Sequence, residues 1–497
     1  MLPDSLVVQS ILGASAAAST TFPNLTSIFG PYLSQSAEII LPTDKEFPDR
    51  LTPRWTDYNK PTYIGAIKPA TENDIQITVE IAADQGLPFF TTGGGHGISN
   101  YSTFTGLSID LSNFRTVELD TKENLLTIGG STKVSQLLDL LWENGKELPL
   151  GSCECVGVVG ATLGGGISSL QGIHGLLLDA LQSVRVVTPS GALLTASRTE
   201  NADLFWALRG AGSNFGIVTS ATYRVSDVVN NGLAMNADFV FPASANRSFF
   251  EIMRGFDEDF PKELGITGVA FFNRSSNEPV IAVNAIYYGP QSTGEPLMQP
   301  FVDLNPTMSN ISTVTSRQLM DAAFFSFFGG NNGACIPNQH INIYTVGLKQ
   351  TPVPTFESFF NDLDGFWREY PDYQGRLLLQ RYANDAVTDV PDEDAAYAQR
   401  QVKTFMNIEG FYTDPGIDAA VDSFVGPARD EFARVSGFEE YTVYSNYARG
   451  DEGAGAWYGS RKLPELTRLK SKWDPKGLFS VHNPVPVHGG EHGRVDL

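Results

Sequence analysis

A histidine inside a glycine run is the first feature of the chain that could do chemistry. The stretch TTGGGHGISNYS, residues 91–102, places His96 directly after three glycines, and the chain has only six histidines. Glycine lets the backbone adopt left-handed conformations and approach another group closely. Two interpretations follow from these residues alone. One is a tight turn with a histidine at its rim, and the other is a backbone cradle that holds a ligand beside one reactive nitrogen.

The cysteines offer a second candidate for chemistry. Cys153 and Cys155 lie in the glycine-rich stretch 151–175, GSCECVGVVGATLGGGISSLQGIHG, whereas Cys335 stands alone. An odd number of cysteines is a poor basis for a disulfide framework, and two cysteines separated by one residue can hardly bridge each other without strain. We therefore expect Cys153 or Cys155 to serve a purpose other than cross-linking, and Cys335 to be a buried packing residue.

Alternating strand and helix patterns must position these two loops. The spacing of apolar residues predicts a strand at 63–69, a helix over 71–86 and a strand at 87–93, so the first loop follows a strand end. The stretch 151–175 is too rich in glycine for a regular helix. The same patterns predict further strands at 107–112, 125–130 and 215–225, a hairpin at 183–197, and helices at 131–145 and 203–210.

The region 227–440 differs from the preceding region in its pattern of elements, and it is rich in phenylalanine. The patterns predict a hairpin at 266–289, a strand at 341–348 and helices at 243–261 and 415–436. Most of the phenylalanines indicate core, and part of them an apolar pocket; the densest group is Phe324, Phe325, Phe327 and Phe328. Polar residues in apolar surroundings are further site candidates: His340, Tyr344 and Arg381.

Composition excludes several classes of function. The 497 residues are 42% hydrophobic, and 34 basic against 56 acidic residues give a net charge of −22. A chain of this length can bury a large core and form more than one domain. The negative charge disfavours binding to nucleic acid, and no apolar run approaches the roughly 20 residues that span a bilayer. We therefore expect no nucleic-acid partner and no membrane span.

The N-terminus leaves the location of the protein open. Residues 1–20 hold a short apolar stretch and small residues like those of a cleavage site, but Asp4 stands where a signal peptide has a basic residue. A secretory route stays open, and it would make use of five glycosylation sequons. These begin at Asn24, Asn100, Asn246, Asn273 and Asn310.

Several well-known catalytic motifs are absent from the sequence. GATLGGG, residues 160–166, does not match the dinucleotide fingerprint, and there is no P-loop, no H-E-x-x-H or Cys-x-x-Cys metal pattern and no G-x-S-x-G elbow. We therefore predict no metal site. The two glycine loops can hold a pyrophosphate through backbone N–H groups without any cation, which suits an acidic chain.

Several stretches taken together resemble one family. They are GGGHG with LSIDLSNF, CECVG with GATLGGGISSLQG, VVTPSG, NADLFWALRGAGSNFGIVTSATYRV and, near the C-terminus, YSNYARGDEGAGAWYGSRKLPELTRLKSKWDPKGLFS. In this order they are similar to the berberine bridge enzyme-like, oxygen-dependent FAD-linked oxidoreductases. Ile173-His174-Gly175-Leu176 departs from the Arg-Tyr-Gly-Leu that is frequent in the family. This departure suggests a subgroup that resembles fungal secondary-metabolite oxidases.

The resemblance implies an α+β fold with two domains. A PCMH-type FAD-binding domain of two subdomains would span 61–226, and an α/β substrate domain with an antiparallel sheet would span 227–440. Residues 1–60 would form an N-terminal segment, and residues 441–497 would return to the flavin domain.

The resemblance also implies covalently bound FAD. His96 would link to the flavin 8α-methyl group, and Cys153 to flavin C6, because Val156 and Gly157 follow Cys153 at the offset of the family motif. Cys155 would then be a small packed residue; the alternatives are a link through Cys155 or no second link. The other residues implied to bind the cofactor are Gly93, Gly94, Gly95, Gly97, Gly157, Gly160, Gly164, Gly165, Gly166, Gly216 and Val218.

Four residues are implied in catalysis. Tyr444, Asn446 and Tyr447 belong to the Y-x-N-Y segment, which the family places on a closing strand that faces the flavin. A phenol with its ordinary pKa near 10 needs a nearby positive charge to act as a base. Val156, three places after Cys153, would border the space through which oxygen reaches the flavin. Valine at this place is typical of oxidases in the family, and leucine or isoleucine of dehydrogenases.

The implied activity is an oxidation with FAD as cofactor and a small molecule and oxygen as partners. A hydride would leave an alcohol or amine carbon for covalent FAD, and oxygen would reoxidise the flavin and yield hydrogen peroxide. Two alternatives stay open. One is a flavoprotein cyclase that uses the pocket as a template without net redox turnover, and the other is a dehydrogenase with a different electron acceptor.

Overall fold

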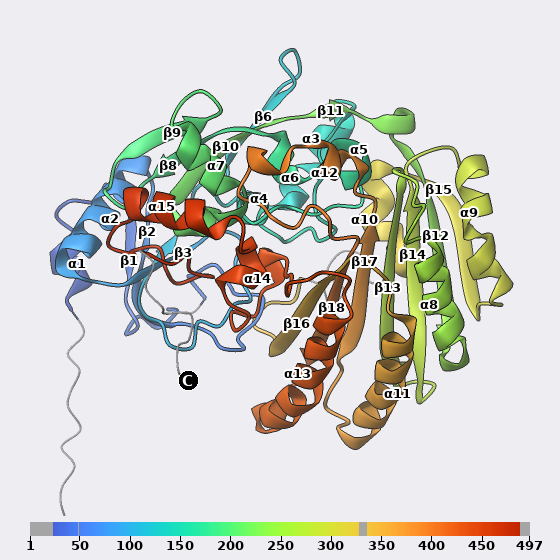
Figure 1. The fold of residues 1–497 in the computed structure, drawn as a ribbon. Helices are drawn as coiled ribbons and strands as arrows, with labels where there is room; N and C mark the ends of the chain where they lie inside the picture. The colour runs from blue at the N-terminus through green and yellow to red at the C-terminus, as the bar shows by residue number, and fades with distance from the viewer. Residues whose placement is uncertain (1–22, 48, 328–334, 488–497) are drawn as a thin grey trace, which may run out of the picture.

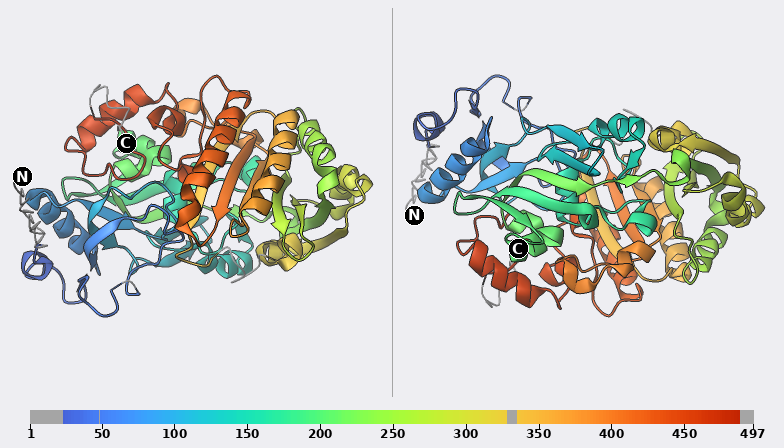
Figure 2. Two further views of the ribbon diagram at one scale, coloured as in Figure 1. Left: turned by 90° about the horizontal axis from the view of Figure 1, so that it is seen from below. Right: turned by 90° about the horizontal axis from the view of Figure 1, so that it is seen from above.

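Three large sheets build the molecule, and the chain passes from one half to the other and back (Figure 1). The computed structural model describes residues 23–47, 49–327 and 335–487. Sheets of four and five strands lie in one half, a seven-stranded sheet lies in the other, and the C-terminal segment packs against the first half (Figure 2). Within these ranges, no helix is both long and apolar enough to cross a bilayer.

The four-stranded sheet carries the first glycine loop. Its strands lie in the order β1, β2, β4, β3, and β2, β3 and β4 are parallel. The helix α2 (Glu72–Gln85) connects β2 to β3; Thr71 and Asp74 form a capping box at its start, and Gly86 ends it in the left-handed conformation, as predicted. The strand bounds are Glu38–Ile40 for β1, Thr62–Lys68 for β2, Phe89–Thr92 for β3 and Thr105–Asp110 for β4.

The five-stranded sheet is antiparallel and lies beside the first. Its order is β5, β6, β10, β8, β9, and β8 and β9 form the hairpin that the sequence predicted around Pro189. The helix α7 (Ala202–Ala211) contributes Leu204, Phe205 and Leu208 to the core of this half. The strand bounds are Val117–Asp120 for β5, Leu125–Gly129 for β6, Leu181–Val187 for β8, Leu193–Ser197 for β9 and Ile217–Arg224 for β10.

Two local predictions in this half are wrong. Instead of one helix over 131–145, the chain makes a short 3₁₀ turn η1 (Val134–Gln136) and then α3 (Leu138–Glu143). The stretch 151–175 was expected to lack a regular helix, but it contains α4 (Val158–Leu163). Val158, Val159 and Thr162 of α4 are buried, so tertiary packing overrides the low helix propensity of glycine. The short helices α5 (Gln171–His174) and α6 (Leu177–Ala180) follow.

The seven-stranded sheet forms the second half of the molecule. All its neighbouring strands are antiparallel, in the order β15, β12, β14, β13, β17, β18, β16, and β13 and β14 form the predicted hairpin. The strand bounds are Leu233–Pro242 for β12, Leu264–Asn273 for β13, Glu278–Tyr287 for β14, Met308–Thr315 for β15, Ile341–Leu348 for β16, Arg376–Tyr382 for β17 and Thr404–Phe411 for β18.

The two faces of this sheet have different neighbours. Four helices cover one face (Figures 1 and 2), and their bounds are Asn246–Gly255 for α8, Gln291–Asp303 for α9, Val353–Glu369 for α11 and Asp418–Arg434 for α13. Side chains alternate along a strand. Leu264 and Ile266 of β13 therefore enter the core under the helices, while Gly265, Thr267 and Val269 face the first half.

Two predictions about the chain after residue 300 need correction. The Y-x-N-Y segment is not a strand: it forms the 3₁₀ turn η9 (Ser445–Tyr447), followed by α14 (Ala454–Tyr458) and α15 (Leu463–Trp473). Within the phenylalanine group, Phe324 and Phe325 are half-buried and Phe327 is 56% exposed, so these three are not core residues. Phe328 lies outside the described residues.

Candidate functional site

A cavity of about 620 Å³ lies where the two halves meet, and it is lined by both glycine loops and by the inner face of the large sheet. Its size is that of a site for a cofactor or drug-sized ligand. Of the residues that the family resemblance implied in cofactor binding or catalysis, every one except Gly165 lines this cavity. Gly165 lies behind the wall, because a side chain there would meet the rings of Tyr397 and Tyr444. Gly165 is thus the one residue of this set that the cavity wall does not include.

The two glycine loops pack backbone against backbone. A Cβ atom at Gly94 would lie 2.4 Å from the backbone nitrogen of Gly157, and one at Gly157 would lie 2.9 Å from the nitrogen of Gly94. Real Cβ atoms do not approach other atoms so closely. Gly95 has a φ of +78° and packs against the carbonyl oxygen of Pro53, 2.3 Å from its ideal Cβ position. The glycines are thus required by the contact between the loops.

His96 lies where the two loops meet. Its Nδ1 is 3.0 Å from the carbonyl oxygen of Gly94, and its ring stacks on Trp55 with the ring centres 5.9 Å apart. Its Nε2 is buried and has no hydrogen-bond partner. Burial lowers the pKa of His96 to about 4, so the ring is neutral near pH 7. With Nδ1–H donating to Gly94, Nε2 carries the lone pair of a neutral imidazole.

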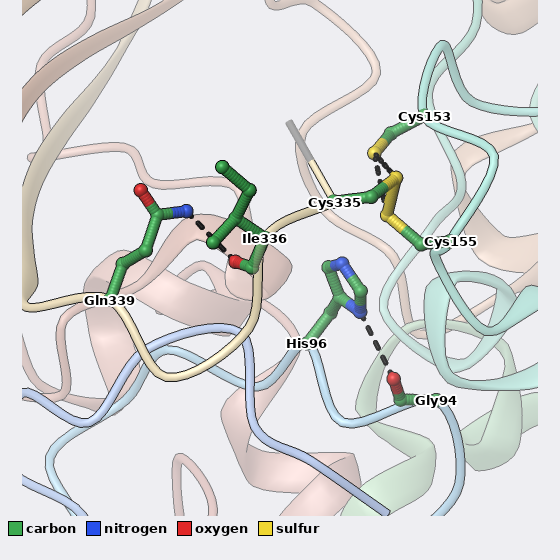
Figure 3. Close-up of a disulfide and its surroundings, with 7 residues drawn as sticks. All are labelled: Gly94, His96, Cys153, Cys155, Cys335, Ile336 and Gln339. Atoms are coloured by element: carbon green, nitrogen blue, oxygen red, sulfur yellow. Dashed lines mark hydrogen bonds between the residues drawn. A yellow bond between two sulfur atoms is a disulfide. The ribbon is translucent and has the colours of Figure 1, made fainter. Parts of the chain in front are cut away.

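The cysteines are arranged differently from the prediction. Cys155 forms a disulfide with Cys335, 180 residues away, so Cys155 is not a small packed residue and Cys335 is not simple core packing (Figure 3). The pairing joins distant parts of the chain, and sequence spacing carries no signal of it. The Sγ of Cys153 lies 3.3 Å from that of Cys155 and 3.8 Å from that of Cys335. Burial raises the pKa of the Cys153 thiol.

His96 and the two neighbouring cysteines form one cluster at this end of the cavity. The ligand atoms of His96, Cys153 and Cys155 all lie within 4.8 Å of one another. Such a group could hold a metal ion in principle. Because Cys155 is already bonded to Cys335, the cluster offers one imidazole nitrogen and one thiol, which is a poor metal site and a suitable pair for covalent attachment.

The Y-x-N-Y residues hold the second loop and reach the large sheet. The hydroxyl of Tyr444 accepts hydrogen bonds from the backbone N–H of Gly166 (2.9 Å) and from Nδ2 of Asn446 (2.7 Å). The hydroxyl of Tyr447 donates to Oε1 of Gln380 on β17 at 2.8 Å. Burial raises the pKa of both phenols, for Tyr447 well above its ordinary value. Both phenols are therefore protonated at neutral pH.

The large sheet supplies site residues that the sequence did not single out. Arg376, Gln380 and Tyr382 occupy alternate positions of β17 and line the cavity, and Arg376 forms an ion pair with Glu409 of β18. The prediction chose Arg381, which points the other way and pairs with Asp257 at 3.2 Å. In a strand the neighbouring residue always faces the opposite side. On this face of β17 the apolar Leu378 lies between Arg376 and Gln380, so the sequence carries no clear polar alternation that marks the wall.

The other two polar candidates also lie outside the cavity wall. His340 pairs with Asp418 at 2.9 Å, and Tyr344 donates to Asp422.

A second group of cavity-lining residues that the sequence analysis did not single out lies under the first glycine loop. Arg54 donates to the carbonyl oxygen of Gly97 at 2.6 Å, and the hydroxyl of Tyr101 lies 2.6 Å from Nδ1 of His482.

Comparison with known proteins identifies the family. Residues 64–197 match the model of an FAD binding domain, and residues 443–486 match the model "Berberine and berberine like". The chain is 59% identical over 489 residues to the FAD-linked oxidoreductase tazG of Aspergillus terreus, covering 98% of this chain and 99% of that protein. It is 46% identical over 466 residues to the FAD-linked oxidoreductase azaL of Aspergillus niger, covering 93% and 98%. The chain belongs to the berberine bridge enzyme-like family of FAD-linked oxidoreductases.

Solved structures of this family share the fold. The BBE-like 1 protein of Physcomitrella patens superposes with a TM-score of 0.82 at 21% identity, covering 94% of this chain and all of that one. A glucooligosaccharide oxidase of Acremonium strictum gives 0.81 at 20% identity, covering 94% and 99%, and its structure is described as revealing a novel flavinylation. A second structure of that oxidase is described as carrying 6-S-cysteinyl, 8α-N1-histidyl FAD.

The cavity fits the FAD that this family binds. It runs along two loops whose backbones pack without side chains, and the neutral imidazole of His96 has a buried nitrogen without a partner at its end. A bound ligand would satisfy that nitrogen. The residues that would hold FAD are therefore those of the two glycine loops, with His96 and Cys153 at the attachment end.

Proposed function

We propose that the protein is an FAD-dependent oxidase acting on an alcohol or amine carbon of a small, mainly apolar substrate of secondary metabolism. The observation that carries the proposal is the placement of one imidazole and one thiol at the end of a cavity whose opposite wall is a rigid sheet. When bound, FAD would accept a hydride from that carbon and deliver the electrons to oxygen. We propose covalent attachment through His96 and Cys153.

Residues of the sheet and of the closing segment would orient the reacting group. Tyr447 keeps its phenolic proton, so it serves as a hydrogen-bonding group toward a substrate hydroxyl or amine rather than as a resting base. Its bond to Gln380 fixes the direction of the phenol. Glu409 carries a carboxylate on the same cavity wall, beside Arg376. We assign Glu409 as the acceptor of the substrate proton.

The wall opposite the loops supports an apolar substrate. Six of the residues that β13, β14 and the segment after β15 contribute to the cavity are apolar, and four are polar: Val269, Ile286, Leu319, Met320, Ala323 and Phe324 against Thr267, Asn284, Ser316 and Arg317. A pocket for sugars needs many hydrogen-bonding groups, because each hydroxyl that is buried without a partner costs binding energy. A flat or aromatic molecule with few polar groups suits this wall better.

The disulfide also supports an oxidising location. Disulfides persist mainly in secreted proteins and in the compartments of the secretory route. The exposed Asn24 and Asn310 are available to glycosylation there. Asn246 is only 6% exposed and its amide donates to the backbone of Glu357, so that sequon is unsuitable. We propose passage through the secretory route, and a glycan at Asn24 or Asn310 in secreted protein would be its direct sign.

Anaerobic reduction tests the activity. Candidate aromatic alcohols and amines are mixed with the oxidised protein without oxygen, and bleaching of the flavin absorbance identifies a substrate. Air is then admitted. Return of the colour with one hydrogen peroxide for each product supports the oxidase. Bleaching that oxygen reverses only slowly indicates a dehydrogenase with another acceptor. Product formation without bleaching and without peroxide indicates a cyclase.

A further inference from the structure

Three sulfur atoms meet beside His96, although only one of them is needed for a link to a flavin. Cys153 lies 3.3 Å from Cys155 and 3.8 Å from Cys335, measured between Sγ atoms, and the last two are joined to each other. Cys153 and Cys155 lie in one loop, and both face the imidazole (Figure 3). By position alone, either could serve as the linking cysteine. The two cysteines differ because Cys155 is held in the disulfide, whereas Cys153 carries a thiol.

The segment that begins at Cys335 is attached to residues beside His96. The backbone N–H of Asn338 donates to the carbonyl oxygen of Arg54 at 2.6 Å, and that of Gln339 donates to Trp55 at 3.2 Å. Trp55 in turn donates to Gly95 and stacks on His96. We call residues 335–339 the strap. It is therefore fixed at one end by the disulfide and at the other by the residues next to His96.

We infer that the Cys155–Cys335 disulfide is a selector: it masks Cys155, fastens the strap to the residues beside His96, and reserves Cys153 as the one thiol of the cluster that can attach to the flavin. This inference rests on the proposed attachment of FAD. It adds a requirement that the attachment alone does not contain, namely that the disulfide has to form for the link to be directed to a single cysteine.

The exchange step balances among the three cysteines, and the attachment step uses oxygen as its oxidant. Thiol–disulfide exchange can move the bridge: the thiolate of Cys153 attacks Sγ of Cys335, a Cys153–Cys335 bond forms, and Cys155 leaves as the thiolate and takes up the proton. The number of disulfides and thiols is unchanged, but the available thiol is now Cys155. Attachment to the ring forms one C–S bond, removes the thiol hydrogen and a ring hydrogen, and passes two electrons to oxygen, which becomes hydrogen peroxide. Once made at Cys153, this bond ends the exchange.

Peptide mapping without reduction tests the selector. Protein made in a secreting host is denatured in the presence of N-ethylmaleimide, digested and analysed by mass spectrometry. In the native chain we expect a peptide pair joined through Cys155 and Cys335, with flavin or maleimide on Cys153. Two variants lack the same disulfide and form a matched pair. C335S leaves thiols at both Cys153 and Cys155, whereas the double variant C155S/C335S leaves only Cys153 beside His96.

The two variants separate selection from mere cross-linking. In C335S we expect the joined peptide to be lost and the flavin to divide between Cys153 and Cys155. In C155S/C335S the flavin should stay on Cys153. Flavin confined to Cys153 in C335S, or a maleimide label on Cys155 of the native chain, would overturn the inference. If no cysteine carries flavin while maleimide marks Cys153 alone in the native chain and both cysteines in C335S, the disulfide masks Cys155 but the proposed attachment fails.

Discussion

The two walls of the cavity are built on opposite principles. On one side, the glycine loops present backbone, and Gly94 and Gly157 leave no room for a side chain between them. On the other side, the strands of the large sheet present alternate side chains such as Thr267 and Gln380 from a backbone fixed by antiparallel pairing. A change in the first wall moves the backbone, whereas a change in the second alters only the surface. The first wall suits a constant cofactor, and the second a substrate that can differ between relatives.

Adding one methyl group to the first wall should have the largest effect. In Gly94→Ala the new Cβ would meet the backbone of Gly157, so the loops must separate. We expect loss of bound flavin and about 2–3 kcal/mol of destabilisation, as for overpacking in a close-packed interior. Gly365→Ala is the control. Its Cβ meets nothing within 4 Å, and it lies inside α11 away from the cavity, so this variant should keep its flavin and its stability. Equal flavin loss in both variants would show that the loss in Gly94→Ala does not come from separation of the two loops.

Removing a hydroxyl from the opposite side should leave the cofactor in place and slow the reaction. In Tyr447→Phe the hydrogen bond to Gln380 and the proposed contact with substrate are lost. We expect roughly a tenfold lower rate of anaerobic flavin reduction, the value of about one hydrogen bond. Flavin content should be unchanged. Tyr344→Phe lies outside the cavity wall and is the control. Flavin loss in Tyr447→Phe would place this residue in the cofactor wall instead.

Replacement of Val156 tests whether one side chain of the loop wall controls the access of oxygen to the flavin. It lines the cavity beside the attachment end, and a larger residue would fill a small space there. Val156→Leu should slow reoxidation by oxygen about tenfold, with little change in anaerobic reduction. Stopped-flow absorbance follows the two half-reactions separately. If both slow equally, the space next to Val156 is not the route of oxygen.

Acid should weaken the first half of the molecule gradually. Burial lowers the pKa of His96 and of His482 to about 4, while the unfolded chain binds these protons near pH 6.5. The unfolded state then holds more protons between these values, so the stabilisation is complete above about pH 6.5 and is lost as the pH falls to 4. Each of the two histidines should contribute about 3 kcal/mol to the stability lost from pH 7 to 4, measured by denaturant unfolding of flavin-free protein. His482→Asn should reduce this loss, and an unchanged loss would contradict the assignment.

The sequence predicted the loop wall well because that wall depends on local residue types. The glycine runs, His96 and the helix over 71–86 each have a signal within a few residues, and these motifs also carried the resemblance to the family. The sheet wall was missed because Leu378 separates Arg376 from Gln380 on the cavity face, so β17 shows no clear alternation of polar and apolar residues. The pairing of Cys155 with Cys335 was missed because nothing local records a contact across 180 residues.

The state of the flavin after acid precipitation tests the central claim most directly. If His96 and Cys153 hold FAD covalently, the washed pellet of the native protein stays yellow, and peptide mapping finds flavin on both residues. His96→Ala should keep only the cysteinyl link. Cys153→Ala should keep only the histidyl link and should regain the flavin fluorescence that a cysteinyl thioether quenches. Flavin that passes wholly into the supernatant of the native protein, or that is found on neither residue, would contradict the account.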